Sequence, residues 1–257
     1  MKKVLIRIGI VLLVLIVVAV LAIGFFLDGA VKRGVEIVGP KITKVAVKLD
    51  AVSLSILSGS GKVKGLVIGN PEGFKSAEAI KVGKAGVALS PGSLLSDKIV
   101  VRSISVEEPE ITFEGSLHGN NLSKLLANVD SASGGGDKST SDQQKASKKL
   151  QVDDFVIKGA RVHVSLTELG GKGATVPIPE IHLTNLGTGP EGITPAELTK
   201  KVLQAVVSET EKAASTVLTD FGKGALNLTK EVGTNASGTV QKATKSIGGL
   251  FKKEKKN

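Results

Sequence analysis

The feature that most constrains the fold of this chain is a run of twenty residues, 8–27, without a charged or strongly polar side chain. At about 1.5 Å per residue, a helix of this length covers roughly 30 Å, the thickness of the hydrocarbon core of a bilayer. Lys2, Lys3 and Arg7 precede the run, and the positive-inside rule places such a basic end in the cytoplasm. The sequence therefore predicts a transmembrane anchor over residues 1–27, with the rest of the chain exported.

A cleaved signal peptide is the alternative, because it also has a basic start. Its apolar region, however, spans only about 7–15 residues. The exit GFFLD (24–28) lacks the small-x-small pattern that a signal peptidase prefers, and DGA (28–30) is a poor substitute. We therefore predict an uncleaved anchor, and the mass of the mature N-terminus distinguishes the two readings.

Composition excludes several classes of protein. Aromatic residues make up 3% of the chain and Trp and Tyr are absent, so any core is built from Val, Ile, Leu and a few Phe, a mixture that favours β-strands. Without Cys there are no disulfides, no thiol catalysis and no cysteine metal sites. The net charge of +10 lies almost wholly at the two ends, which suits anionic lipid better than a nucleic-acid-binding face. We expect membrane lipids as partners and no nucleic acid.

Between the anchor and the tail, apolar and polar residues alternate with a period of two. A short helix over 28–41 precedes the strands, and a second short helix covers 121–129. The phase of the alternation slips at Asp50–Ala51, which predicts a β-bulge, and again at Asp153–Asp154. We predict strands over residues 45–56, 62–68, 79–89, 98–106, 109–114, 150–157, 160–167 and 175–184.

Short intervals between these strands predict a mainly antiparallel sheet, and its one-sided apolar alternation requires something to cover one face. The sheet falls into two parts, 28–129 and 149–193. Between them, residues 130–148 (DSASGGGDKSTSDQQKASK) are of low complexity and form a predicted linker.

The tail, 194–257, is predicted to be a long amphipathic helix that opens with Thr194, Pro195 and Glu197. Charges recur in it at intervals of eleven residues, so its apolar stripe runs nearly straight. That stripe is thin and the opposite face is rich in Lys, and both a sheet face and a lipid headgroup layer would suit it. The candidate membrane-contacting side chains are Val217, Phe221, Leu228, Ile247, Leu250 and Phe251.

Catalysis finds no support in the sequence. His118, His163 and His182 are scattered, and no metalloprotease, paired-carboxylate or nucleophile-elbow motif is present. The segment GSGK (59–62) resembles half of a phosphate loop, but its spacing and flanking strands indicate a hairpin turn. We therefore predict a protein that is not an enzyme, with no catalytic, cofactor-binding or metal-binding residues.

Three segments carry a family resemblance. They are VGPKITKVAVKLDAVSLSILSGSGKVKGLVIGNPEGF (38–74), SLLSDKIVVRSISVEEPEITFEGSLHGNNLSKLLANV (93–129) and LQVDDFVIKGARVHVS (150–165). Together with the basic-start anchor, they resemble the N-terminal module of the AsmA family, the AsmA- and TamB-like proteins of the bacterial envelope. The resemblance covers residues 1–165 well, and the helical tail lies outside it.

The resemblance implies an anchor in the bacterial inner membrane and a periplasmic β-sheet curled into an apolar groove or half-barrel. The implied role is phospholipid binding or transfer, or outer-membrane assembly, with envelope proteins as possible partners. Eight strands at about 4.8 Å spacing span only about 40 Å, so this chain is too short to bridge the envelope. The candidate groove face comprises Val45, Val47, Leu49, Val52, Leu54, Ile56, Ile111, Phe113, Val162 and Val164.

Two readings without lipid cargo stay open beside this one. The first is a structural tether that holds envelope components together. The second is an anchored β-sandwich resembling the water-stress domains, with which the chain shares the turn GNP (69–71). The cover of the inward-facing residues distinguishes them from the lipid-binding reading, because a groove requires an open cleft and a tether does not.

Overall fold

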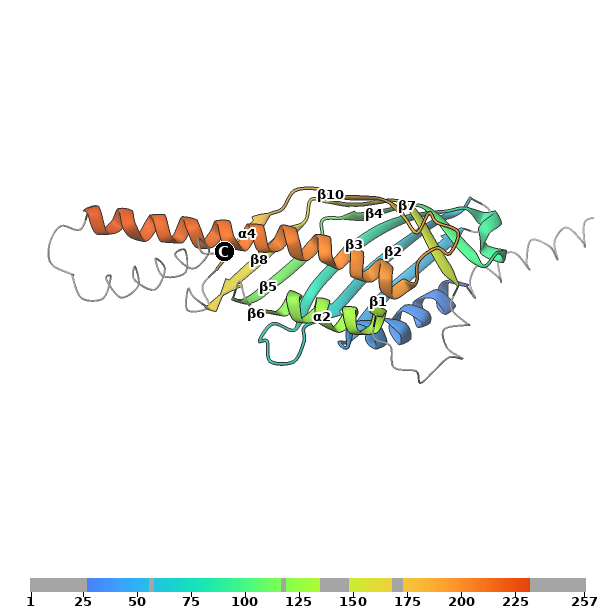
Figure 1. Ribbon diagram of the computed structural model, residues 1–257, viewed down its shortest axis with the longest axis horizontal. Helices are drawn as coiled ribbons and strands as arrows, with labels where there is room; N and C mark the ends of the chain where they lie inside the picture. Colours follow the sequence, from blue (N-terminus) through green and yellow to red (C-terminus); the bar gives the residue numbers. More distant parts are fainter. Residues whose placement is uncertain (1–26, 56–57, 117–118, 135–147, 168–172, 232–257) are drawn as a thin grey trace, which may run out of the picture.

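A computed structural model of the chain describes residues 27–55, 58–116, 119–134, 148–167 and 173–231 (Figure 1). It confirms a mainly β fold with helices, in which one sheet of ten strands curls into an open half-barrel. The strands are β1 (Val47–Ser55), β2 (Ser60–Gly69), β3 (Glu78–Leu89), β4 (Lys98–Glu107), β5 (Glu110–Ser116), β6 (Gly119–Asn120), β7 (Lys149–Lys158), β8 (Arg161–Leu166), β9 (Gly173–Pro177) and β10 (Ile181–Leu186).

The ten strands lie in six rows that follow the order of the chain. Three pairs of strands continue one another, and the two-residue β6 lies on the β3 side of β5, in line with the row of β3. The register of β4 on β7 carries on unchanged as that of β5 on β8, and Glu108 N donates to Lys158 O at 2.8 Å across the junction. The pairings of β9 and β10 continue one another in the same way. Six rows at about 4.8 Å span about 24 Å, narrower than the eight separate strands that the sequence predicts.

All neighbouring rows are antiparallel except one junction, where β4 lies parallel to β7 and β5 parallel to β8. A parallel neighbour requires a crossover, and the chain makes it between β6 and β7 through helix α2 (Asn121–Gly134). Helix α2 ends at Gly134, so its last five residues belong to the predicted linker 130–148. The Ser131 and Ser133 hydroxyls donate to the carbonyls four residues earlier, and Asp130 pairs with Lys200.

The predicted bulge at Asp50 is wrong, since the register of β1 on β2 is continuous from Val47 to Ser55. Opposite Asp50 stands Gly65, with a φ of 62°. A Cβ on Gly65 would lie 1.9 Å from the Asp50 Oδ2 atom, so only glycine fits there. Both strands change phase together, which leaves their pairing intact.

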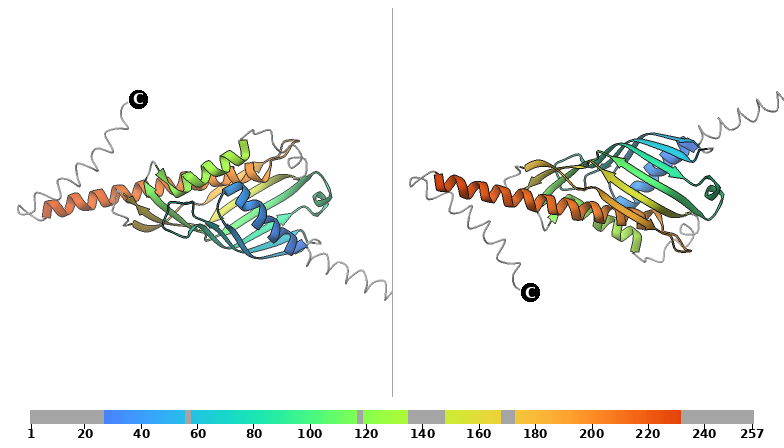
Figure 2. Two further views of the ribbon diagram at one scale, coloured as in Figure 1. Left: turned by 90° about the horizontal axis from the view of Figure 1, so that it is seen from below. Right: turned by 90° about the horizontal axis from the view of Figure 1, so that it is seen from above.

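The same change of phase occurs in the neighbouring strands, at positions that lie opposite one another across the sheet. The flanking register pairs align Asp50 and Gly65 with Gly83, Glu108 and Gly159, and Glu108 and Gly159 also have positive φ angles of 49° and 64°. In each of these strands the alternation of inward and outward side chains shifts by one residue at this level. This shared shift adds to the ordinary strand twist and accompanies the curl seen in Figure 2.

A helix over residues 27–43 follows the free edge of β1, as the predicted helix 28–41 suggests. Asp28 Oδ1 accepts from Leu54 N at 2.7 Å, and Glu36 Oε1 accepts from Leu49 N at 3.2 Å. Between them, Lys32 Nζ donates to the Asp50 carbonyl at 3.0 Å. Three side chains four residues apart thus satisfy backbone groups that an edge strand would otherwise offer to another chain.

Two helices lie on the concave face, where Figure 1 shows them in front of the strands. Helix α4 (Pro195–Glu231) contacts β8, β9 and β10, and α2 contacts β5 and α4. Thr194 caps α4 as predicted, because its Oγ1 accepts from Glu197 N at 3.1 Å and Glu197 Oε2 accepts from Thr194 N at 2.7 Å. These hydrogen bonds from Thr194 are the main reason why the pKa of Glu197 is lowered. In the described part of the chain, no helix is long and apolar enough to cross a bilayer.

Candidate apolar site on the concave face

Most of the candidate groove residues point inward and are covered by protein. Ile111, Phe113, Val162 and Val164 are at most 3% exposed and belong to the core beneath α2 and α4. Val45, Val47, Leu49 and Val52 are also buried, Leu54 is half-buried, and Ile56 lies outside the described residues. The alternation therefore assigned the inward face correctly for the described residues, but an open groove is absent at the buried positions.

The cover over β1 comes from the helix 27–43. A Cβ on Gly39 would lie 2.9 Å from the Val47 Cβ atom, so the helix backbone approaches this strand as closely as glycine permits. The cover over the other side of the sheet comes from α4, which contacts β8, β9 and β10. The two covers stand on opposite sides of the rows formed by β2, β3 and β4.

Between the two covers lies a set of half-buried apolar side chains that we call the apolar strip. The register places Val63, Ala85 and Val106 in one transverse row and Val87 and Ile104 in the next, beside Leu54 of β1. Val106 and Ile104 continue the rows of the core residues Ile157 and Phe155 on β7, which fixes the strip on the concave face. The strip consists of Leu54, Val63, Ala85, Val87, Ile104 and Val106, all intermediate in exposure.

Five of these six residues are missing from the candidates drawn from the sequence. The alternation in 79–89 and 98–106 identified the strands, and it also carried the signal for the inward side chains. What the sequence could not supply was the position of the covering helices. These determine which inward residues are sealed and which stay partly open.

The candidate membrane-contacting residues of the tail differ in their exposure, and several lie outside the described residues. Val217 is 5% exposed and packs in the core, so its assignment to a membrane contact is corrected. Phe221 is 42% exposed. It belongs to α4, whose C-terminal part extends past the sheet in Figure 1. The Leu228 side chain, Ile247, Leu250 and Phe251 lie outside the described part.

A buried polar network fixes the loop between β2 and β3, and the sequence analysis missed it. Asn121, fully buried at the start of α2, donates from Nδ2 to Asn70 Oδ1 and to Thr112 O, both at 2.8 Å. The Glu114 carboxylate accepts from Lys75 N at 2.6 Å and from Ser76 N at 2.8 Å. Burial alone would raise the pKa of Glu114, but these backbone hydrogen bonds leave the pKa lowered. The network is a structural clamp, and its signal in the sequence is the pair of adjacent Asn residues before an apolar helix.

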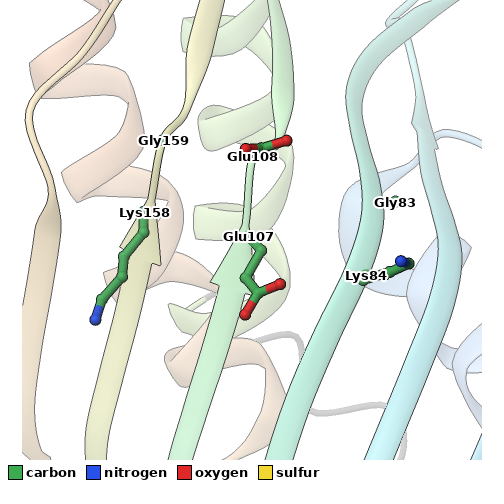
Figure 3. Close-up of a pocket in the computed structure, with 6 residues that line it drawn as sticks. All are labelled: Gly83, Lys84, Glu107, Glu108, Lys158 and Gly159. Atoms are coloured by element: carbon green, nitrogen blue, oxygen red, sulfur yellow. The ribbon is translucent and has the colours of Figure 1, made fainter.

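A charged hollow of about 530 Å³ lies on the convex face (Figure 3). It lies where Gly83 and Gly159 leave space, and it is lined by Lys84, Lys158 and two adjacent glutamates, Glu107 and Glu108. All of these residues are exposed, with two charges of each sign, so the hollow is a solvated surface feature.

The two described histidines lie at exposed positions of strands β8 and β10. His163 Nδ1 lies 2.7 Å from Thr175 Oγ1, and His182 Nε2 lies 2.5 Å from Asp154 Oδ1. Both side chains are exposed, and His118 lies outside the described residues. Within the described ranges, no group of three or more His, Asp or Glu side chains could hold a metal ion.

Comparison with known proteins yields no relative. No protein-family model matches the chain, and neither a curated protein nor a solved structure matches it. The resemblance to the AsmA family therefore stays a prediction that depends on the sequence motifs alone. The feature of the structure that bears most directly on function is the apolar strip.

Proposed function

We propose that this chain is a membrane-anchored protein of the bacterial inner membrane whose periplasmic half-barrel binds an acyl chain of a phospholipid. The observation that carries the proposal is the apolar strip, six neighbouring aliphatic side chains that the covering helices leave half-buried. Contiguous apolar surface on a concave face is typical of ligand-binding grooves. The predicted anchor, the resemblance to the AsmA family and the absence of a recognisable catalytic motif in the sequence support the same proposal.

The strip suits an acyl chain better than a compact ligand. It spans four adjacent strands from β1 to β4, or about 14 Å at the usual strand spacing. Its side chains are aliphatic throughout, which gives dispersion contacts along a flexible hydrocarbon without any polar group that would fix an orientation. Lipid handling or transfer at the membrane, and through it outer-membrane assembly, is the role that we infer.

A structural tether without lipid cargo is the second candidate. The observation that favours it is the near-complete burial of Ile111, Phe113 and Val162 beneath the helices, which leaves that part of the sheet without a groove. The anchored β-sandwich is less well supported, because the described residues form a single sheet with helices on its concave face.

The test is lipid retention by the full chain purified in a mild non-ionic detergent. Bound phospholipid is measured by mass spectrometry and by uptake of a phospholipid with a fluorescent acyl chain. The variant Ile104→Glu places a carboxylate in the strip, and Ser105→Glu places the same charge one residue later on the convex face. We expect Ile104→Glu to weaken uptake about tenfold or more, because a carboxylate is costly to bury beside an acyl chain, and Ser105→Glu to leave it unchanged.

Two results would overturn the proposal. A wild-type protein that neither retains phospholipid nor takes up the labelled one would leave the tether as the better account. Equal uptake by both variants, with circular dichroism spectra like that of the wild type, would show that lipid binds elsewhere.

A further inference from the structure

One apolar side chain on this molecule is almost entirely in water. Leu95 is 96% exposed, whereas the other large apolar side chains found exposed in the described part of the chain are at most 52% exposed. It ends the short helical turn η1 (Pro91–Leu95), between β3 and β4. A single exposed leucine is ordinary on a protein surface, so its meaning depends on how it is held and where it lies.

The turn that carries Leu95 is held by many hydrogen bonds for its size. Ser93 Oγ donates to Ser90 O at 2.7 Å and accepts from Val100 N at 2.9 Å. Ser96 Oγ lies 2.7 Å from the Ser93 carbonyl, and Lys148 Nζ donates to the Leu94 carbonyl at 2.5 Å. Leu95 is therefore presented on an ordered turn.

The turn lies at the end of the sheet where the helix 27–43 begins. Asp28 Oδ1 binds Leu54 N near the end of β1, and the next residue, Ser55, pairs with Ser60 at the start of β2. Leu89 N donates to Gly59 O, so the end of β3 meets the same hairpin just before η1. Figure 2 shows the dark blue start of the helix and this turn at the same end of the molecule.

The apolar run 8–27 ends where that helix starts, so a bilayer that holds this run lies against this end of the sheet. From β1 to β3 the sheet advances two strand spacings, about 10 Å, which keeps η1 close to the point where the chain leaves the membrane. We infer that the η1 turn is a second membrane contact, in which Leu95 inserts into the interface of the bilayer that holds the anchor. The inference depends on the anchor proposed above and adds a site to it.

The charges at this end of the sheet indicate which lipids it suits. Lys98, Lys148 and Lys149 lie near the turn, and the acids around them are Asp97, Glu191 and Glu197. Lysines and acids are balanced there, so the contact is apolar and independent of anionic lipid. It differs in this respect from the Lys-rich tail.

The chain contains no Trp or Tyr, so one introduced Trp reports its own surroundings without background. The full chain is reconstituted into phosphatidylcholine vesicles with brominated acyl chains, which quench a Trp that enters the bilayer. The probe is Leu95→Trp, and the control is Glu72→Trp in the exposed loop at the opposite end of the sheet. Ile16→Trp, inside the apolar run, reports whether the anchor is inserted. We expect blue-shifted, strongly quenched emission from Leu95→Trp and Ile16→Trp and water-like emission from Glu72→Trp.

Quenching of Ile16→Trp without quenching of Leu95→Trp would overturn the inference and leave the anchor intact. Absence of quenching at both positions would overturn the anchor as well. Quenching of Leu95→Trp that appears only when anionic phosphatidylglycerol is added would contradict the apolar contact. If Leu95→Trp lacks the circular dichroism spectrum of the wild type, Gly92→Trp reads the same turn, because nothing lies within 4 Å of a Cβ at that position.

Discussion

Replacing Asn121 by Ala tests the clamp that joins the β2–β3 loop, β5 and the start of α2. The side chain makes three hydrogen bonds while fully buried: Nδ2 donates to Asn70 Oδ1 and Thr112 O, and Oδ1 accepts from Glu114 N at 2.9 Å. Each contributes about 0.5–1.5 kcal/mol net, and the partner residues Asn70, Thr112 and Glu114 are only partly exposed. We expect Asn121→Ala to lower the free energy of unfolding by about 3 kcal/mol.

The matched control is Asn128→Ala on the same helix, where a half-buried Nδ2 makes one hydrogen bond, to Thr43 O at 3.0 Å. We expect it to cost about 1 kcal/mol. Asn121 is the first residue of α2, whereas Asn128 lies in its interior, where Ala gains about 0.5 kcal/mol in helix propensity. The expected difference of about 2 kcal/mol between the variants exceeds this gain and reports the clamp.

The assay is urea unfolding of the full chain in a non-ionic detergent, followed by far-ultraviolet circular dichroism. With a denaturant slope of about 2–3 kcal/mol per molar urea, the midpoint of Asn121→Ala falls by about 1 M and that of Asn128→Ala by less than half of this. Equal midpoints for the two variants would refute the reasoning, because they would show that the buried amide is not a point of attachment for the loop.

Three further predictions use the same unfolding assay. Thr210→Val should raise the free energy of unfolding by about 1 kcal/mol, because the buried Thr210 hydroxyl has no partner in the described structure; a loss of stability would reveal a hidden partner. The pKa values of Glu114 and Glu197 are lowered on folding, so both carboxylates stabilise the fold above pH 4.5, and this stabilisation is lost as the pH falls through the folded pKa values. Glu114→Gln should therefore reduce the loss of stability in acid. An unchanged dependence of the unfolding free energy on pH would contradict this. Gly65→Ala should cost at least 2 kcal/mol, because Gly65 has a positive φ and no room for a Cβ. Gly86→Ala, where a Cβ meets open space, should change stability by less than about 0.5 kcal/mol. Similar losses for the two variants would argue against a special backbone conformation at Gly65.

The sequence predicted the strands and their faces because both depend on neighbours along the chain. Alternation alone placed Ile111 and Phe113 inward, and the two residues are buried. The start of α4 at Thr194 was predicted for the same reason, since all the groups that cap it lie within four residues. Local chemistry sufficed for each of these features.

Features that depend on distant partners were beyond the sequence. The phase slip at Asp50 predicted a bulge because one strand, taken alone, cannot show that β2 changes phase at the same level through Gly65. The alternation also could not reveal that β7 lies parallel to β4. For the same reason Val217 was assigned to a membrane contact, although the core of its own domain buries it.

The burial of α4 decides how a lipid could reach the apolar strip. Its inward residues Leu203, Val206, Val207, Val217 and Leu218 are each at most 6% exposed. Full burial of such a side chain contributes about 1.5–3 kcal/mol, so lifting α4 away would expose surface worth roughly 8–15 kcal/mol. That is as large as the whole stability of a typical domain, so α4 cannot act as a lid that opens and closes. If the proposed function holds, a lipid enters with α4 in place, between α4 and the helix 27–43, where the strip is half-buried and the end of the sheet that we propose to face the membrane is nearest.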